Sequence, residues 1–303
     1  MDRKQILKAV HILRNGGLVA FPTETVYGLG ADASNETAVQ AIFKVKGRPE
    51  SHPLIVHLHD VDQVRRWATS VPKAALDLGR KFWPGPLTLI LKKAPKVSRK
   101  VTGGQETVGL RVPNHPVALA LLREFGGGVA APSANRFGKV SPTSAGHVRK
   151  DLGKDVDFVL DGGSCDIGVE STIVDFSSGD PVILRPGGLT RERLEKALGR
   201  PVRIRGGGSV RASGQLESHY APRARVVVVP PKESKATAVR LGKKGKRVVL
   251  LSRKDVSARK LYASLRRADE SGAQVIVVPL PEEAGLGLAV ADRLRKAAGK
   301  RLR

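Results

Sequence analysis

The stretch GGLVAFPTETVYGLG, residues 16–30, is where the fold of this chain is most directly legible. Its apolar run, residues 18–21, predicts a short buried strand, because continuous apolar residues bounded by turn signals are typical of strands covered on both faces. Pro22 ends the strand, since proline cannot donate to a sheet ladder. Hydroxyls and a carboxylate follow at residues 23–25, where a core would otherwise continue. This placement indicates either a ligand site or a capped turn.

Outward from this stretch, helices and strands alternate as far as residue 204. Helical spacing and end signals predict helices over residues 6–14, 36–46, 61–68, 73–82, 117–125 and 190–198. Short apolar runs predict strands over residues 54–58, 87–92, 107–112, 129–131, 158–160, 172–176 and 182–184. We therefore expect residues 1–204 to form one mixed α/β domain.

The composition changes after residue 204. Residues 205–224 are rich in glycine, serine and charge, which is typical of a linker. From Arg225 the pattern of strand and helix occurs three times, with strands RVVVVP, RVVLLS and QVIVVPL. Continuous Val, Leu and Ile runs between helices predict a small parallel, Rossmann-like α/β domain over residues 225–303.

The chain is strongly basic, with a formal net charge of +25 over 303 residues. Residues 225–303 contain 20 basic and 7 acidic side chains, a net charge of +13. Such a charge favours an anionic partner: a nucleotide, a polyphosphate or a nucleic acid. A thermophilic or generally basic proteome accounts for the same composition.

Several functional classes lack their sequence signals. No signal peptide and no apolar run of membrane-spanning length are present, and the single Cys165 excludes an intrachain disulfide. We therefore expect a cytoplasmic protein. The motifs GxxxxGK[ST], CxxC and HExxH are absent.

Polar side chains recur at the ends of the predicted strands and helices. They are Lys46 and Arg48 after a helix, His57 in a strand, Thr107 and Arg111 on one strand face, Ser133 and Asn135 after a strand, Ser141, Glu170, Ser171, Thr172 and Arg185. Ligands of open α/β sheets bind in the crevice outside strand ends. Cations there neutralise phosphates, and hydroxyls and glycine backbones complete the cradle.

Each of these residues also has a local structural explanation. Lys46 and Arg48 suit solvated charges at a helix C-terminus, and His57 suits a core histidine. Arg111 suits a solvent-facing strand position, and residues 133–135 suit a turn. Cys165 suits an inert, small core residue. Because polar side chains recur at strand ends, separate local explanations account less well for the whole set than for any one residue.

The motifs FPTETVYGLG, KVKGRP, HPLIVH, WPGPLTLIL, VGLRVPNHP, APSAN, GVESTIVD, ILRPGG and HYAPRA occur in order along the chain. Together they resemble the YrdC-type threonylcarbamoyl-AMP synthase family, in its longer two-domain form. The resemblance implies a YrdC-like open twisted mixed sheet with helices. It also implies an L-threonylcarbamoyladenylate synthase, a nucleotidyltransferase that converts ATP, L-threonine and bicarbonate to L-threonylcarbamoyl-AMP and pyrophosphate. That reaction is the first step of threonylcarbamoyladenosine modification of tRNA.

The resemblance assigns roles residue by residue. The catalytic signature falls on Lys46, Arg48, Ser133 and Asn135. Threonine binding falls on Thr25, His57, Arg111, Ala131 and Ser171. ATP binding falls on Arg48, His52, Thr107, Ser133, Ser141, Arg185 and Tyr220. His52 departs from the asparagine usual in the family, and an imidazole offers its donor and acceptor in a different geometry.

The resemblance also implies the cofactor and the partners. Mg²⁺ is expected to be held mainly by the ATP phosphates, with no dedicated metal site and with Glu24 or Glu170 assisting at most. The product is expected to pass to a tRNA threonylcarbamoyl-transfer complex, with weak tRNA binding by the basic C-terminal domain and no membrane association.

The linker contains one large aromatic residue that needs an explanation, Tyr220. Tyr220 in the SHYAP stretch is expected to be the contact of a lid that excludes water from the labile intermediates. The alternative is that Tyr220 only anchors the linker to the first domain. Two other functional readings remain: an RNA-binding module without ATP turnover, and a catalytically idle paralogue of the family. Aromatic residues make up only 4%, which disfavours a base-stacking RNA binder, and the intact signature disfavours the paralogue.

Overall fold

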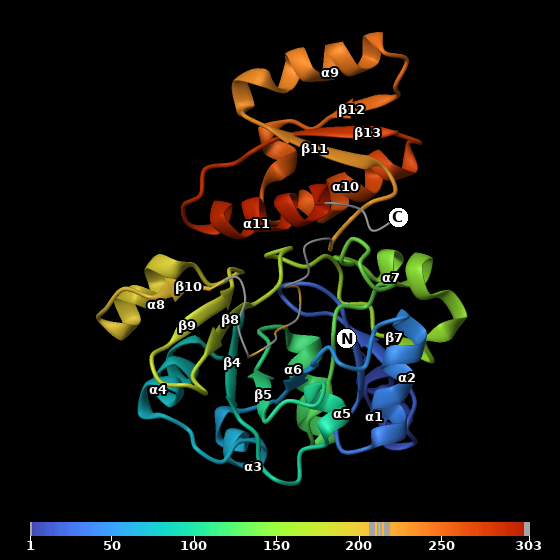
Figure 1. The fold of residues 1–303 in the computed structure, drawn as a ribbon. Helices are drawn as coiled ribbons and strands as arrows, with labels where there is room; N and C mark the ends of the chain where they lie inside the picture. The colour runs from blue at the N-terminus through green and yellow to red at the C-terminus, as the bar shows by residue number, and fades with distance from the viewer. Residues whose placement is uncertain (1, 206–209, 211, 213, 215–218, 300–303) are drawn as a thin grey trace.

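The computed structural model describes residues 2–205, 210, 212, 214 and 219–299. Its larger sheet has ten strands in the order β10-β9-β8-β4-β5-β3-β6-β2-β1-β7 (Figure 1). These are β1 (Val19–Phe21), β2 (Gly28–Asp32), β3 (Ile55–His57), β4 (Leu87–Lys92), β5 (Thr107–Arg111), β6 (Val129–Ala130), β7 (Phe158–Val159), β8 (Thr172–Asp175), β9 (Val182–Arg185) and β10 (Arg203–Ile204). Parallel and antiparallel pairs are both present, so the predicted mixed sheet is confirmed.

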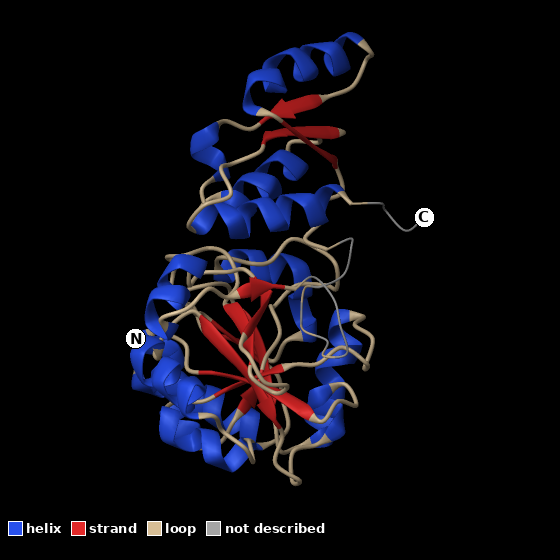
Figure 2. Cartoon of the chain, turned by 60° about the vertical axis from the view of Figure 1, so that its left-hand side comes forward, coloured by secondary structure: helices blue, strands red, loops and turns tan. Residues whose placement is uncertain are grey.

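Helices surround this sheet (Figure 2). They are α1 (Arg3–Arg14), α2 (Glu36–Lys46), α3 (Val64–Trp67), α4 (Lys73–Phe82), α5 (Arg99–Thr102), α6 (Pro116–Phe125), α7 (Ala145–Leu152) and α8 (Arg191–Leu198). Two 3-10 helices, η1 (Val61–Gln63) and η2 (Gly153–Asp155), adjoin α3 and α7. The sequence did not predict α5, α7, β2 or β10.

Strand β2 explains the glycines of the opening stretch. It pairs antiparallel with β1, with Phe21 opposite Gly28 and Val19 opposite Gly30. A Cβ atom at Gly30 would lie 2.9 Å from the Phe21 ring and 2.7 Å from Val129. Such distances are far shorter than van der Waals contact, so only glycine lets β2 pack this closely. Residues 22–27 therefore form the loop of a hairpin.

Helix α2 places two predicted site residues. The Asn35 side chain accepts a hydrogen bond from the backbone N–H of Ala38 at 3.1 Å and caps the N-terminus, as predicted. Gly47 adopts the left-handed conformation, with φ of 61°, and ends the helix. Lys46 and Arg48 consequently lie on either side of the point where the chain leaves the helix.

The C-terminal domain has the predicted parallel sheet, in the order β11-β13-β12. Its elements are β11 (Arg225–Val229), η3 (Pro231–Glu233), α9 (Ser234–Lys243), β12 (Val248–Leu250), η4 (Arg253–Val256), α10 (Leu261–Glu270), β13 (Val275–Pro279) and α11 (Leu286–Ala298). Helices α10 and α11 lie between this sheet and the larger domain, and α9 covers the far face (Figure 1).

The hydrophobic core continues across the domain boundary. The apolar cluster under α10 and α11 includes Val26, Val140 and Val169 of the larger domain. Cys165 is also buried, and burial raises the pKa of its thiol to about 12, as expected for an inert core residue. Among the described residues, no helix is long and apolar enough to cross a membrane.

Candidate active site

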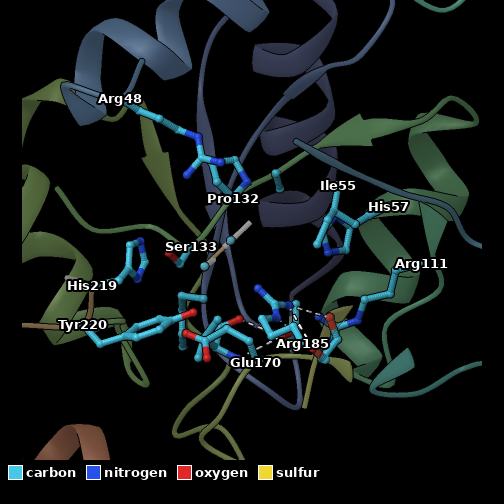
Figure 3. A pocket seen from close by; sticks show the side chains of 17 residues that line it. Arg48, Ile55, His57, Arg111, Pro132, Ser133, Glu170, Arg185, His219 and Tyr220 are labelled. Atoms are coloured by element: carbon cyan, nitrogen blue, oxygen red, sulfur yellow. Dashed lines mark hydrogen bonds between the residues drawn. The ribbon is translucent and has the colours of Figure 1, made fainter. Parts of the chain in front are cut away.

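A cavity that opens to solvent lies at the ends of β3, β5, β6 and β9 and at the starts of β2 and β8 (Figure 3). We call it the central cavity. It is lined by Thr23, Val26, Tyr27, Gly28, Arg48, Ile55, His57, Arg111, Ala131, Pro132, Ser133, Glu170, Ser171, Arg185, Gly214, His219 and Tyr220. Eight of the residues to which the family resemblance assigns a role line it: Arg48, His57, Arg111, Ala131, Ser133, Ser171, Arg185 and Tyr220.

One side of the central cavity is organised by Arg111 at the end of β5. Its guanidinium forms an ion pair with Glu24 at 2.8 Å and donates to the Thr25 hydroxyl at 2.8 Å. The Thr23 hydroxyl holds the same hairpin loop in a turn by donating to the Val26 carbonyl at 2.6 Å. Arg111 is buried, so the alternative of a solvent-facing strand position is wrong.

His57 lies beside Arg111, because β3 pairs parallel with β5 and places the two residues opposite each other. Its ring packs edge-on against Phe21, with centroids 5.7 Å apart. Burial, together with the nearby Arg111 cation, lowers the pKa of His57 to about 3. The imidazole is therefore neutral at physiological pH and can exchange hydrogen bonds with a ligand without adding charge.

Lys46 is buried, with 3% of its surface exposed, rather than solvated at the helix end. Its ammonium donates to the backbone carbonyls of Ser133, at 2.5 Å, and Asn135. Burial, reinforced by Arg48, lowers the pKa of Lys46 well below its usual value. The Asn135 amide donates to the Arg136 and Lys139 carbonyls, at 2.7 and 2.9 Å. Lys46 and Asn135 thus shape the loop that presents Ser133 to the cavity.

Two further arginines line the cavity: Arg48 lies across it from Arg111, and Arg185 lies between them, nearer to Arg111 (Figure 3). Arg48 donates to the Pro53 carbonyl at 3.0 Å and lies over the Phe137 ring. Arg185, in β9, donates to the Ser171 carbonyl at 2.9 and 3.1 Å and to the Ser171 hydroxyl at 3.1 Å. Burial lowers the pKa of Arg48 to about 10, so its guanidinium remains cationic at neutral pH, and burial also lowers the pKa of Arg185.

The described linker residues close the cavity from one side. Tyr220 is 1% exposed and has the positive φ of 61° that non-glycine residues seldom adopt. A Cβ atom at Gly214 would lie 2.3 Å from the Tyr220 hydroxyl, so the linker backbone passes directly over that oxygen. His219 packs edge-on against Tyr220, with ring centroids 4.1 Å apart. Most of the proposed lid, residues 206–209, 211, 213 and 215–218, lies outside the described residues.

Glu170 is a lining carboxylate whose main partners are distant in sequence. It accepts hydrogen bonds from the Ser141 hydroxyl at 2.6 Å and from Arg293 Nε at 2.7 Å. The Tyr262 hydroxyl lies 2.8 and 3.0 Å from the two carboxylate oxygens. Ser141 therefore does not line the cavity itself but is hydrogen-bonded to Glu170, which does. No three His, Cys, Asp or Glu side chains in the described part of the chain gather as metal ligands would.

The remaining predicted residues lie near the cavity or apart from it. Thr25 does not line the central cavity, but its hydroxyl accepts a hydrogen bond from Arg111. Thr107 lines a neighbouring cavity, which shares Ile55 with the central one. His52 packs edge-on against Phe137, with centroids 5.3 Å apart. Tyr27, His219 and Arg293 were not predicted, although Tyr27 lies in the FPTETVYGLG motif and His219 in the HYAP motif beside Tyr220.

The fold is a mixed sheet covered by helices, and three arginines among the described residues line one cavity. Together these features define an α/β protein with an anion-binding site. The family model Sua5_yciO_yrdC, described as "Telomere recombination", matches residues 11–187, and the model "Threonylcarbamoyl-AMP synthase, C-terminal domain" matches residues 189–299. The chain belongs to the Sua5, YciO and YrdC family, in the two-domain form of the threonylcarbamoyl-AMP synthases.

Relatives resemble the chain over its whole length. It is 44% identical to the threonylcarbamoyl-AMP synthase of Pyrococcus abyssi, across 100% of this chain and 96% of the relative. It is 41% identical to that of Bacillus subtilis, across 98% and 94%. The crystal structure of Pyrococcus abyssi Sua5 complexed with L-threonine matches with a TM-score of 0.93 and 42% identity, across 98% of this chain and 95% of that one.

Proposed function

We propose that this protein is an L-threonylcarbamoyladenylate synthase, which converts ATP, L-threonine and bicarbonate to L-threonylcarbamoyl-AMP and pyrophosphate. The observation that supports this most strongly is that three arginines, Arg48, Arg111 and Arg185, line one cavity, which suits substrates that carry a carboxylate and phosphates. The full-length likeness to a Sua5 protein complexed with L-threonine supports threonine as one substrate.

On the threonine side, Arg111 binds the substrate carboxylate, because a guanidinium fork matches a carboxylate with two parallel hydrogen bonds. Thr25, His57 and Ala131 surround the amino acid, and Ser171 contributes a hydroxyl. Support comes from the position of His57 opposite Arg111 in the sheet register, which gives a neutral donor and acceptor beside the cation.

On the ATP side, Arg48 and Arg185 contact the phosphates, and the Ser133 hydroxyl completes the cradle. Lys46 and Asn135 act through the Ser133 loop, whose carbonyls the Lys46 ammonium holds. Tyr220 closes the mouth of the site. Ser141 contributes through its hydrogen bond to Glu170. His52 and Thr107 are assigned to ATP by the family resemblance, and neither lines the central cavity.

In the reaction, the unprotonated threonine amine attacks bicarbonate with loss of water, or carbon dioxide with loss of a proton, to give a carbamate. A carbamate oxygen then attacks the α-phosphate, and pyrophosphate leaves. The cations of the cavity favour the neutral amine by lowering its pKa, and they stabilise the charge that shifts onto the leaving phosphates. Holding the substrates in one cavity removes a large part of the entropic barrier.

The proposal extends to the metal ion, the fate of the product and the domain boundaries. Mg²⁺ would neutralise phosphate charge and be held mainly by ATP. The product passes to a tRNA threonylcarbamoyl-transfer complex, with weak tRNA binding by the basic C-terminal domain, in the cytoplasm. The domains are taken as residues 1–204 and 225–303, joined by 205–224, which agrees with the separate membership of the two sheets.

An isotope experiment tests the identity of the product. With ATP, L-threonine and ¹³C-bicarbonate, mass spectrometry should detect an adenylate that contains both threonine and the label. The alternative, an RNA-binding module, predicts RNA affinity that falls steeply with salt and no such adenylate. An adenylate without the label would contradict the proposed reaction.

A further inference from the structure

Two residues of the C-terminal domain reach the wall of the central cavity. Arg293, in α11, and Tyr262, in α10, both contact Glu170, and both are essentially excluded from solvent, with 1% and 0% exposed. Arg293 is 123 positions away from Glu170 in sequence. Arg293 also donates to the Pro186 carbonyl at 3.0 Å, beside Arg185, so its guanidinium is fixed at the edge of the cavity.

The same two residues hold the Tyr220 ring. The Arg293 guanidinium lies 5.0 Å from the centre of that ring, within the range of a cation–π contact. The Tyr262 ring stacks on Tyr220, with centroids 5.8 Å apart and planes 24° apart. Glu170 and Tyr220 both line the cavity. One arginine and one tyrosine therefore fix two lining groups together.

The charge of Glu170 makes this arrangement significant for a phosphate ligand. Although burial raises the pKa of the Glu170 carboxyl, Arg293 and Arg185 together lower it to about 2, so it is ionised at neutral pH. An uncompensated carboxylate in this wall would repel a triphosphate bound by Arg48 and Arg185. Arg293 offsets that negative charge from behind, outside the lining of the cavity.

We propose that Arg293 and Tyr262 are positioning residues for ATP: they neutralise and orient the Glu170 carboxylate and fix the Tyr220 ring on the phosphate side of the site. This proposal rests on the proposed function for the identity of the nucleotide. It makes the C-terminal domain a structural part of the nucleotide site. The threonine side has its own internal pair, Arg111 with Glu24, and does not depend on Arg293.

The variant Arg293→Gln tests the proposal. This variant loses the charged hydrogen bond between Arg293 and Glu170. We expect the KM for ATP to rise roughly 10- to 100-fold. The Kd for a non-hydrolysable ATP analogue, measured by calorimetry, should rise by a similar factor. The KM for threonine should change little. The double variant Glu170→Gln with Arg293→Gln removes both charges, so its ATP affinity should recover toward that of the parent. It also serves as the test if the single variant fails to fold.

Arg266→Gln is the matched control. Arg266, in α10, is a buried arginine that pairs with Asp151 of α7 across the same domain interface at 2.5 Å, and neither residue lines the central cavity. Both arginine variants should lower the melting temperature, but only Arg293→Gln should selectively weaken ATP binding. Equal losses of ATP affinity in the two variants, or no recovery in the double variant, would overturn the proposal. Failure of the parent protein to bind the analogue would instead overturn the proposed function.

Discussion

Replacement of Lys46 by alanine is expected to lower kcat by roughly 100-fold or more, the scale of one lost electrostatic contribution to a transition state. The Lys46 ammonium ties the Ser133 and Asn135 carbonyls together in a buried site. Without it, two buried carbonyls lose their donor, and the Ser133 loop is no longer fixed beside the phosphates. Because misplacement of a reacting group acts mainly on turnover, KM should change much less than kcat.

Steady-state kinetics of Lys46→Ala and Lys44→Ala provide the comparison. Lys44 lies in the last turn of the same helix and is exposed, so its loss should leave kcat near the parent value. Circular dichroism of both variants separates a kinetic defect from unfolding. If Lys46→Ala raised only the KM for ATP, Lys46 would contribute to simple binding and not to the transition state.

Replacement of Arg111 by lysine should raise the KM for threonine roughly 100-fold, the scale of a lost charge-assisted pair. Lysine retains the positive charge opposite Glu24 but lacks the planar fork that binds a carboxylate with two hydrogen bonds. Lysine is preferable to alanine at this position, because removing one partner of a buried ion pair costs about 3–5 kcal/mol of stability. The KM for ATP should change little.

Arg123→Lys is a control for the same chemical change at an exposed position of α6. It should match the parent for both substrates. Equal losses of threonine and ATP affinity in Arg111→Lys would count against a dedicated threonine role for this arginine.

The sequence predicted most of the fold, because most elements carry a local signal. Asn35 and Gly47 mark the two ends of α2, and continuous Val and Ile runs mark β11 and β13. Strand β2 was missed because its glycines are unfavourable for a strand taken alone. Their reason is tertiary: the Phe21 ring and Val129 leave no room for a Cβ atom.

The candidate site, like the fold, could be predicted from the sequence only where a residue carries a local signal. Lys46 and Arg48 had a sequence signal at the end of a helix, but the signal did not reveal that Lys46 would be buried against two carbonyls. Arg293 had none, since it lies in an α11 sequence that is typical of an amphipathic helix. Its partner Glu170 belongs to the other domain, and only the packing of α10 and α11 brings them together.

Pyrophosphate release should depend on all three proposed substrates. The rate should be measured with ATP, L-threonine and bicarbonate together, and again with each of the three omitted, in buffer freed of dissolved carbon dioxide. The account predicts rapid release only in the complete mixture, because the attacking carbamate forms from threonine and bicarbonate before ATP is cleaved. Equally fast release of pyrophosphate without threonine would contradict it.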